Sequence, residues 1–230
     1  MPDVQIKAAD GGAFSAYLSV PARPKGPAVI TMQQIFGVNA EMRGYTDDFA
    51  AQGYFAICPD LFWRQKPNVQ LTPGTAQALE QALAFNRGLD LDKAVDDLKA
   101  TLAFIRAYPG CNGKVATIGY CLGGLTAFLM AVRSDAECNV SYFGVGIEKW
   151  IKEAANLRQP LMLHVPEEDR TVPPEAQAII RDGVRGKAEF FAYQRADHAF
   201  NRVGSRSYDK AVTELADGRT ADFLRRYLGA

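Results

Sequence analysis

Short apolar runs recur along the 230-residue chain, each bounded by glycine, proline or charged residues. The run FSAYLSV at 14–20 alternates apolar and polar positions and stops at Pro21, which is typical of an edge or antiparallel strand. The other runs are almost continuously apolar, as expected of parallel strands covered on both faces. They lie at 28–32, 54–58, 114–119, 140–146, 160–165 and 188–193. The pattern predicts a sheet of about seven or eight strands.

Apolar residues spaced three and four apart predict helices between these strands. Asp90 and Asp92 offer N-caps for the second of them, and the last is one helix or two, interrupted near Asp217 and Gly218. The predicted helices lie at 41–53, 91–108, 122–132, 174–183 and 207–229. Strands that alternate with helices indicate right-handed crossovers and a mostly parallel sheet with helices on both faces, an α/β fold.

The domain organisation follows from what separates these elements. The longest irregular stretch, at 64–75, is expected to be a loop at a site or on the surface. We find no internal repeat, low-complexity tract or interdomain linker in the sequence. We therefore predict one domain over residues 1–230.

Charge and composition exclude several classes of protein. The 26 basic and 26 acidic residues cancel, so we expect no nucleic-acid or membrane partner. The N-terminal segment lacks the cationic and apolar regions of a secretory signal, and no apolar run is long enough to span a bilayer. A cytoplasmic location is expected.

The cysteines and histidines are too few and too scattered to predict a metal site. The four cysteines contain no CxxC pair, and the only two histidines are His164 and His198. Most of the thiols are expected to be reduced and inert. The cysteines are Cys58, Cys111, Cys121 and Cys138.

The segment KVATIGYCLGGLTAFLMA, at 114–131, places Cys121 between two glycines where a strand meets a helix. Gly-x-Cys-x-Gly in this context is the nucleophile-elbow pattern with cysteine in place of serine. The N-terminus of the following helix favours a thiolate, and the Leu122 amide is placed to donate to an oxyanion. The alternative is a small buried cysteine in a tight turn.

A cysteine nucleophile needs a base, and the base needs an orienting acid, which follow the nucleophile in this order along such folds. Asp169 comes four residues after the run at 160–165, with Glu168 as the neighbour that could be confused with it. His198 follows the last apolar run, whereas His164 lies inside a strand and is expected to be a hydrogen-bonded core residue. The sequence predicts a triad of Cys121, Asp169 and His198.

A second oxyanion donor is expected from the loop after an early strand. The segment AVITMQQIFGVN supplies it, with the Ile35 amide as the candidate donor. Phe36, Gly37 and Asn39 are expected to shape the mouth of the pocket and to begin the next helix.

These stretches resemble the dienelactone hydrolase (carboxymethylenebutenolidase) family of α/β-hydrolases. The resemblance rests on QQIFGVNAEMR, AICPDLFWRQ, NGKVATIGYCLGG, EEDRTVP and DHAF. It implies an α/β-hydrolase fold, a triad at Cys121, Asp169 and His198, and oxyanion donors at Ile35 and Leu122. It also implies a small-molecule ester or lactone substrate, aromatic-compound degradation, no cofactor and no metal. A monomer or weak homodimer is expected.

Two positions depart from the family pattern. Gln34 stands where dienelactone-cleaving members carry a glutamate that takes part in thiol activation, and an amide cannot accept the thiol proton. Arg202 matches one of the family's carboxylate-binding arginines, but the other falls at or near Leu79. Arg64 or Arg87 could supply the missing guanidinium from another direction.

The residues favour two-step acyl transfer through a covalent acyl-enzyme. Gln34 and Leu79 leave open an esterase or thioesterase acting on a smaller or more apolar substrate. They also leave open a catalytically silent scaffold that binds a small molecule. A redox role for Cys121 is the weakest alternative, because no resolving cysteine lies nearby in the sequence.

Overall fold

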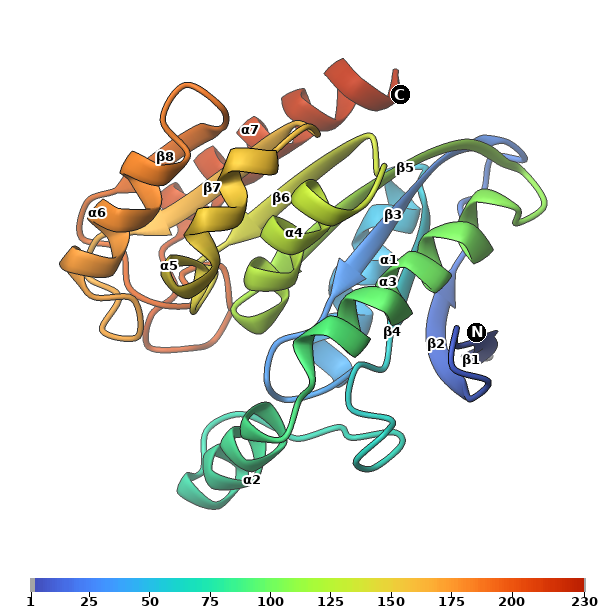
Figure 1. The fold of residues 1–230 in the computed structure, drawn as a ribbon, viewed down its shortest axis with the longest axis horizontal. Coiled ribbons are helices and arrows are strands. Elements are labelled where there is room, and N and C mark those ends of the chain that lie inside the picture. Colours follow the sequence, from blue (N-terminus) through green and yellow to red (C-terminus); the bar gives the residue numbers. More distant parts are fainter. Residues whose placement is uncertain (1–2, 230) are drawn as a thin grey trace. The chain divides into compact units, whose positions relative to one another are not determined.

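The computed structural model describes residues 3–229, in which strands and helices alternate along the chain (Figure 1). The chain divides into two compact units, Met1–Thr117 and Ile118–Ala230. Strand β5, Cys111–Tyr120, runs across the boundary between them. The two units are described in turn.

The first unit contains four strands, β1 (Asp3–Lys7), β2 (Ala13–Ser19), β3 (Gly26–Met32) and β4 (Phe55–Pro59). β2 pairs antiparallel with both β1 and β4, while β3 and β4 are parallel. The antiparallel prediction for 14–20 is therefore confirmed. β2 is not at the edge, however, because β1 covers its other side. Only Ile6 of β1 is buried, so the strand, which was not predicted, lies largely exposed.

Two predicted helices of the first unit form close to their expected bounds, α1 (Ala40–Ala51) and α3 (Leu91–Arg106). Both contact β3 and β4, and every residue of β3 is buried. Asp90 is the N-cap of α3, since its side chain accepts hydrogen bonds from the amides of the first helical turn. Helices thus cover the central strands of this unit.

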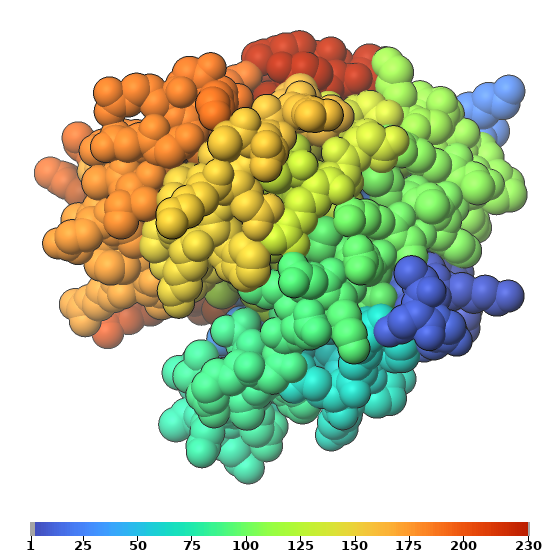
Figure 2. Space-filling view, viewed as in Figure 1, coloured from blue at the N-terminus to red at the C-terminus, as the bar shows by residue number. Residues whose placement is uncertain are grey.

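Helix α2 (Ala76–Arg87) was not predicted. Its N-cap is Thr75, and Ala82 is its only buried residue. The helix therefore lies at the surface of the first unit, as the space-filling view shows (Figure 2). The preceding segment 64–75 has no regular helix or strand, as predicted, and only an isolated bridge joins Gln70 to Gly37.

The second unit contains the parallel strands β6 (Cys138–Tyr142), β7 (Leu161–Pro166) and β8 (Glu189–Tyr193). β7 lies between β6 and β8, and both of its pairings are parallel. Helices α4 (Leu122–Arg133) and α6 (Pro174–Gly183) match their predicted positions. Because the strands run in the same direction, the loops that follow them emerge at one edge of the sheet.

Two short helical segments and one long helix complete the second unit. The short ones are α5 (Ile147–Trp150) and the 3-10 helix η1 (Ile151–Asn156), which were not predicted. The long one, α7 (Lys210–Leu228), continues through Asp217 and Gly218, so the predicted interruption there is wrong. A glycine inside a helix costs only about 1 kcal/mol relative to alanine. Burial of one face of α7 stabilises the helix by more than that cost. The buried residues of this face are Ala216, Thr220, Phe223, Leu224 and Leu228.

Candidate active site

Cys121 lies at the sharp turn where β5 ends and α4 begins. Its φ is 58° and its ψ is −112°, a conformation that non-glycine residues rarely adopt. The amide of Cys121 donates to the Tyr142 carbonyl (3.0 Å), and its own carbonyl accepts from the Gly124 amide (3.0 Å) and the Val145 amide (3.2 Å). Hydrogen bonds from two segments thus hold the strained nucleophile elbow in place.

The close approach of strand and helix at the elbow requires glycine. A Cβ atom added at Gly119 would lie 1.8 Å from the carbonyl oxygen of Gly123. No side chain can be accommodated at that distance without moving the backbone. The glycines around Cys121 therefore set how closely α4 can follow the end of β5.

We expect Gly119→Ala to lower the free energy of unfolding by about 3 kcal/mol, because the new methyl group overlaps a backbone carbonyl. Gly44→Ala in α1 is the control. A Cβ there would have nothing within 4 Å, so it should raise the free energy of unfolding by roughly 0.5–1 kcal/mol. Urea denaturation followed by circular dichroism measures both, and equal stability of the two variants would contradict the steric argument.

Asp169 and His198 meet at the ends of the loops that follow β7 and β8. His198 Nδ1 lies 2.6 Å from Asp169 Oδ2. The side chain of Asp169 is inaccessible to solvent, whereas that of His198 is 22% exposed. Glu168, the neighbour in sequence, is exposed, and its amide donates to the Ala196 carbonyl (2.9 Å). The structure thus places Asp169, and not Glu168, against the histidine.

Thr171 completes the contacts of the buried carboxylate and was not predicted from the sequence. Its amide and its hydroxyl both donate to Asp169 Oδ1, at 2.8 Å and 2.6 Å. The hydroxyl oxygen also lies 3.0 Å from His198 Nδ1. An acidic residue two positions before a threonine is a known pattern for such local bonds from side chain to backbone. The spacing of Asp169 and Thr171 in the sequence could therefore have predicted this contact.

We expect Thr171→Val to lower kcat/KM roughly 10- to 100-fold for any ester that the protein hydrolyses, the range that corresponds to loss of one hydrogen bond to a charged group. The valine leaves the backbone bond to Asp169 intact but removes the hydroxyl that holds Asp169 beside His198. Thr171→Ser, which keeps a hydroxyl, should retain most of the activity. Steady-state kinetics of both variants decide the point: equal loss in the two would mean that the methyl group matters and the hydroxyl does not.

The protonation states of this pair follow from its surroundings. Burial lowers the pKa of His198, but the electrostatic interaction with Cys121 and hydrogen bonds with Asp169 and Cys121 outweigh it and raise the pKa to about 10. Burial raises the pKa of Asp169, yet the hydrogen bonds from His198 and Thr171 hold it below its ordinary value. The surroundings of the pair thus favour a protonated imidazole beside an ionised carboxylate.

His198 reaches both other members of the predicted triad. Nδ1 is occupied by Asp169, which leaves Nε2 for the hydrogen bond between His198 and the side chain of Cys121. The ring of Phe143 lies edge-on to the imidazole, with centroids 4.9 Å apart and an angle of 64° between the planes. Phe143 was not predicted to touch the site. The structure thus brings together Cys121, His198 and Asp169.

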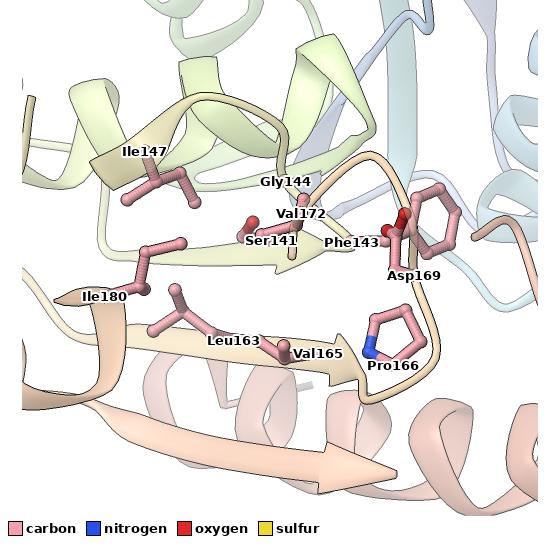
Figure 3. Close-up of a pocket in the computed structure, with 10 residues that line it drawn as sticks. All are labelled: Ser141, Phe143, Gly144, Ile147, Leu163, Val165, Pro166, Asp169, Val172 and Ile180. Carbon is pink, nitrogen blue, oxygen red and sulfur yellow. The ribbon is translucent and has the colours of Figure 1, made fainter. Parts of the chain in front are cut away.

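A small cavity beside Asp169 shields the carboxylate on its inner side. The cavity lies between β6, β7 and α6, and its walls are mostly apolar (Figure 3). They include Leu163, Val165, Val172 and Ile180. The carboxylate thus lies against an apolar environment, in which its hydrogen bond with His198 is stronger than it would be in water.

Leu122 and Arg202 are the other predicted site residues in the second unit. Leu122 is the first residue of α4, where backbone amides have no carbonyl partner inside the helix. Its amide is thus adjacent to Cys121 and oriented by the helix. Arg202 is half-buried in the loop after His198, where its amide donates to the Ala199 carbonyl (2.9 Å).

The remaining predicted site residues belong to the first unit, and their place beside Cys121 stays a prediction. Gln34 and Phe36 are buried, whereas Ile35 is partly exposed. Gln34 Nε2 donates to Glu41 Oε1 (3.1 Å). Leu79 is on α2, where it is 46% exposed.

The loop that carries Ile35 turns at Gly37 and leads into helix α1 at Asn39. Gly37 has φ 79°, and a Cβ there would lie 1.9 Å from the Val69 carbonyl oxygen. Asn39 is the N-cap of α1, accepting a hydrogen bond from the Met42 amide at 3.1 Å. The prediction that Asn39 begins the next helix is confirmed.

The suggestion that Arg64 could bind a substrate carboxylate conflicts with its contacts. Its guanidinium is paired with Asp97 and, at 2.8 Å, with Asp10, and it stacks on the Trp63 ring at 4.2 Å. These contacts already use the charge of Arg64. Arg87 lies exposed in the last turn of α2.

The described part of the chain has neither a cluster of metal-ligating side chains nor a membrane-spanning helix. Among residues 3–229, no three His, Cys, Asp or Glu side chains are grouped so that they could hold a metal ion. None of the helices in that range combines the length and the apolar character needed to cross a bilayer.

Comparison with known proteins places the chain in context. The model of the Dienelactone hydrolase family matches residues 14–228. A provisionally named carboxymethylenebutenolidase of Azospirillum brasilense is 42% identical over the whole of both chains. Carboxymethylenebutenolidase 1 of Cupriavidus pinatubonensis is 38% identical, covering 96% of this chain and 95% of its own. The crystal structure of a provisionally named dienelactone hydrolase from Klebsiella pneumoniae superimposes with a TM-score of 0.85 and 24% identity, over 98% of each chain.

Proposed function

Because the chain belongs to the dienelactone hydrolase family, has the α/β-hydrolase fold and is a carboxylic ester hydrolase, we propose that it cleaves a small ester or enol-lactone through Cys121, His198 and Asp169. The observation that carries the proposal is the contact of His198 with both other residues. Its Nδ1 is 2.6 Å from Asp169 Oδ2, and its ring is hydrogen-bonded to Cys121.

The first half of the proposed reaction forms an acyl-enzyme. The Cys121 thiolate attacks the substrate carbonyl carbon, and the carbonyl π electrons move to oxygen. The Leu122 amide, with the Ile35 amide as the predicted second donor, stabilises the oxyanion. When the intermediate collapses, the C–O bond breaks and the leaving oxygen takes the proton from His198 Nε2, giving a thioester on Cys121.

The second half releases the acid. Water attacks the thioester while the neutral His198 accepts one of its protons. Collapse of this second intermediate expels the Cys121 thiolate and yields the carboxylic acid. Asp169 stays ionised throughout and stabilises the imidazolium each time it forms. An enolate or another good leaving group suits a thiolate nucleophile, since thiolate itself is readily expelled.

The proposed substrate class includes esters that are less acidic than dienelactone. Gln34 is hydrogen-bonded to Glu41, and Arg64 is paired with Asp97 and Asp10. Neither residue is therefore free to bind a substrate carboxylate. The family resemblance makes Arg202 the candidate for that role, and a neutral ester or thioester does not need a carboxylate-binding residue.

A paired substrate screen tests the function. Hydrolysis of p-nitrophenyl acetate and of a neutral enol-lactone is compared with hydrolysis of a dienelactone that carries a free carboxylate. We expect turnover of at least one of them and loss of preference for the acidic substrate in Arg202→Ala. Absence of turnover with all of them, together with saturable binding of any one, would favour a silent binding scaffold.

A further inference from the structure

A series of hydrogen-bonded polar side chains crosses the second unit from β8 through β7 to β6. His164 is its centre and is completely buried. Its Nδ1 lies 2.7 Å from the Tyr193 hydroxyl and its Nε2 lies 2.9 Å from Thr220 Oγ1. The prediction that His164 is a hydrogen-bonded core residue is thus confirmed. The mechanism above does not use it.

This series of hydrogen-bonded side chains ends on both sides at charged residues of α7. Thr220 Oγ1 lies 2.7 Å from the Tyr142 hydroxyl, which donates to Asp217 Oδ1 at 2.9 Å. At the other end, the Tyr193 side chain is hydrogen-bonded to Arg219, whose guanidinium stacks on Phe191 at 4.1 Å. The order is Arg219, Tyr193, His164, Thr220, Tyr142 and Asp217.

The two charged ends fix the direction of every hydrogen bond between them. A carboxylate only accepts, so the Tyr142 hydroxyl gives its proton to Asp217 and must accept from Thr220. Thr220 has then used its own proton and accepts from Nε2–H of His164. Nδ1 is left as an acceptor for the Tyr193 hydroxyl, whose oxygen accepts from Arg219.

This assignment requires a neutral imidazole with its proton on Nε2. Burial, followed by the positive charge of Arg219, lowers the pKa of His164 to about 3. The ring is therefore uncharged at neutral pH. This agrees with the donor and acceptor roles that Asp217 and Arg219 impose on the hydrogen bonds between them.

The main chain of the same residues holds all three segments of the predicted triad. The Tyr142 carbonyl accepts from the Cys121 amide at 3.0 Å. The Tyr193 carbonyl accepts from the amides of Glu167 (3.0 Å) and Ala196 (3.4 Å), in the loops that carry Asp169 and His198.

His164 contributes a further main-chain contact of this kind. Its carbonyl accepts from the amide of Phe143 at 2.8 Å, and the Phe143 ring lies against His198. A shift of any of these strand ends would move a residue of the triad or one of its neighbours.

We propose that His164, as the Nε2–H tautomer, together with Thr220, Tyr142 and Tyr193, is a positioning network that locks α7 to β6, β7 and β8 and thereby aligns Cys121, Asp169 and His198. The positioning role rests on the proposed function, whereas the direction of the hydrogen bonds does not. Helix α7 supplies Thr220 to this network and also the two charged residues at its ends, Asp217 and Arg219. Rotation or sliding of that helix would break several bonds at once.

The tautomer is tested by ¹⁵N NMR of the histidine rings in the intact protein. With only two histidines in the chain, assignment needs one variant, His198→Gln. We expect His164 to have a protonated Nε2 and an unprotonated Nδ1 at neutral pH. A protonated Nδ1 would overturn the proposed direction of the hydrogen bonds, whatever reaction the protein catalyses.

Positioning is tested with Thr220→Val, which removes the hydroxyl, and with Thr220→Ser, which keeps it. If Thr220→Val misplaces the triad, kcat should fall about 10- to 100-fold with little change in KM, and Thr220→Ser should restore it. Tyr227→Phe, elsewhere on α7, is the matched control and should behave as wild type.

The ring resonances of His198 provide a readout that needs no substrate. They should shift in Thr220→Val but stay in place in Thr220→Ser and Tyr227→Phe. A folded Thr220→Val protein with wild-type His198 resonances and wild-type kcat would overturn the positioning role.

If the protein hydrolyses no ester, the proposed function fails. The His164 and His198 resonances still decide whether the network exists and whether it reaches the triad. If Thr220→Val does not fold, Tyr193→Phe, which removes the hydroxyl at Nδ1, takes its place with the same expected shifts.

Discussion

Replacing Cys121 with alanine is expected to lower kcat for ester hydrolysis at least about 10⁴-fold, as loss of the nucleophile does in other triad hydrolases. The alanine removes the only side chain at the elbow that can form a covalent bond with the substrate. Because the fold around residue 121 depends on glycines and backbone hydrogen bonds, the variant should remain folded. Steady-state kinetics with p-nitrophenyl acetate, together with circular dichroism, measure the effect.

Cys111→Ala is the matched control for that experiment. Cys111 lies at the start of β5, at the other end of that strand from Cys121, and is partly exposed, so its loss should leave kcat unchanged. Equal activity of Cys121→Ala and the wild-type protein would show that the nucleophile is another group.

Asp169→Asn should produce the second large loss, about 10⁴-fold in kcat, the size seen when the orienting aspartate of a triad becomes an amide. The amide has nearly the same shape, but it cannot stabilise the imidazolium of His198. Since the hydrogen bond and the negative charge of Asp169 both help to raise the pKa of His198, that pKa should also fall. NMR titration of the His198 ring measures the shift alongside the kinetics.

Glu168→Gln separates the role of Asp169 from a general loss of acidic charge in the loop. Glu168 is exposed, and its amide, which donates to the Ala196 carbonyl, is unchanged by the substitution, so kcat should change by no more than about 2-fold. A large loss in Glu168→Gln with little loss in Asp169→Asn would mean that the acid has been assigned to the wrong neighbour.

The positions of the three predicted triad residues could be inferred from the sequence because each follows an apolar run. The runs become β5, β7 and β8. Because β7 and β8 pair in parallel, the loops after those two strands share one sheet edge. The glycines around Cys121 indicate the close turn between strand and helix, which the 1.8 Å approach at Gly119 explains. Local sequence therefore contained enough information for these residues.

Other features depend on contacts between distant parts of the chain. The network around His164 joins β6, β7, β8 and α7, and its existence depends on the register of those strands and on how α7 lies across them. Sequence spacing does not determine that arrangement. β1 and α2 were missed for another reason, since both are largely exposed and each has a single buried residue.

Chemical trapping of the acyl-enzyme tests the central claim most directly. The protein is mixed with a slowly deacylated p-nitrophenyl ester, quenched in acid within the first turnover and digested for mass spectrometry. We predict one acyl group per chain, on the peptide that contains Cys121, and a release of one equivalent of p-nitrophenol in the burst. Turnover of the ester with no adduct on that peptide, or with the acyl group on another residue, would contradict the account.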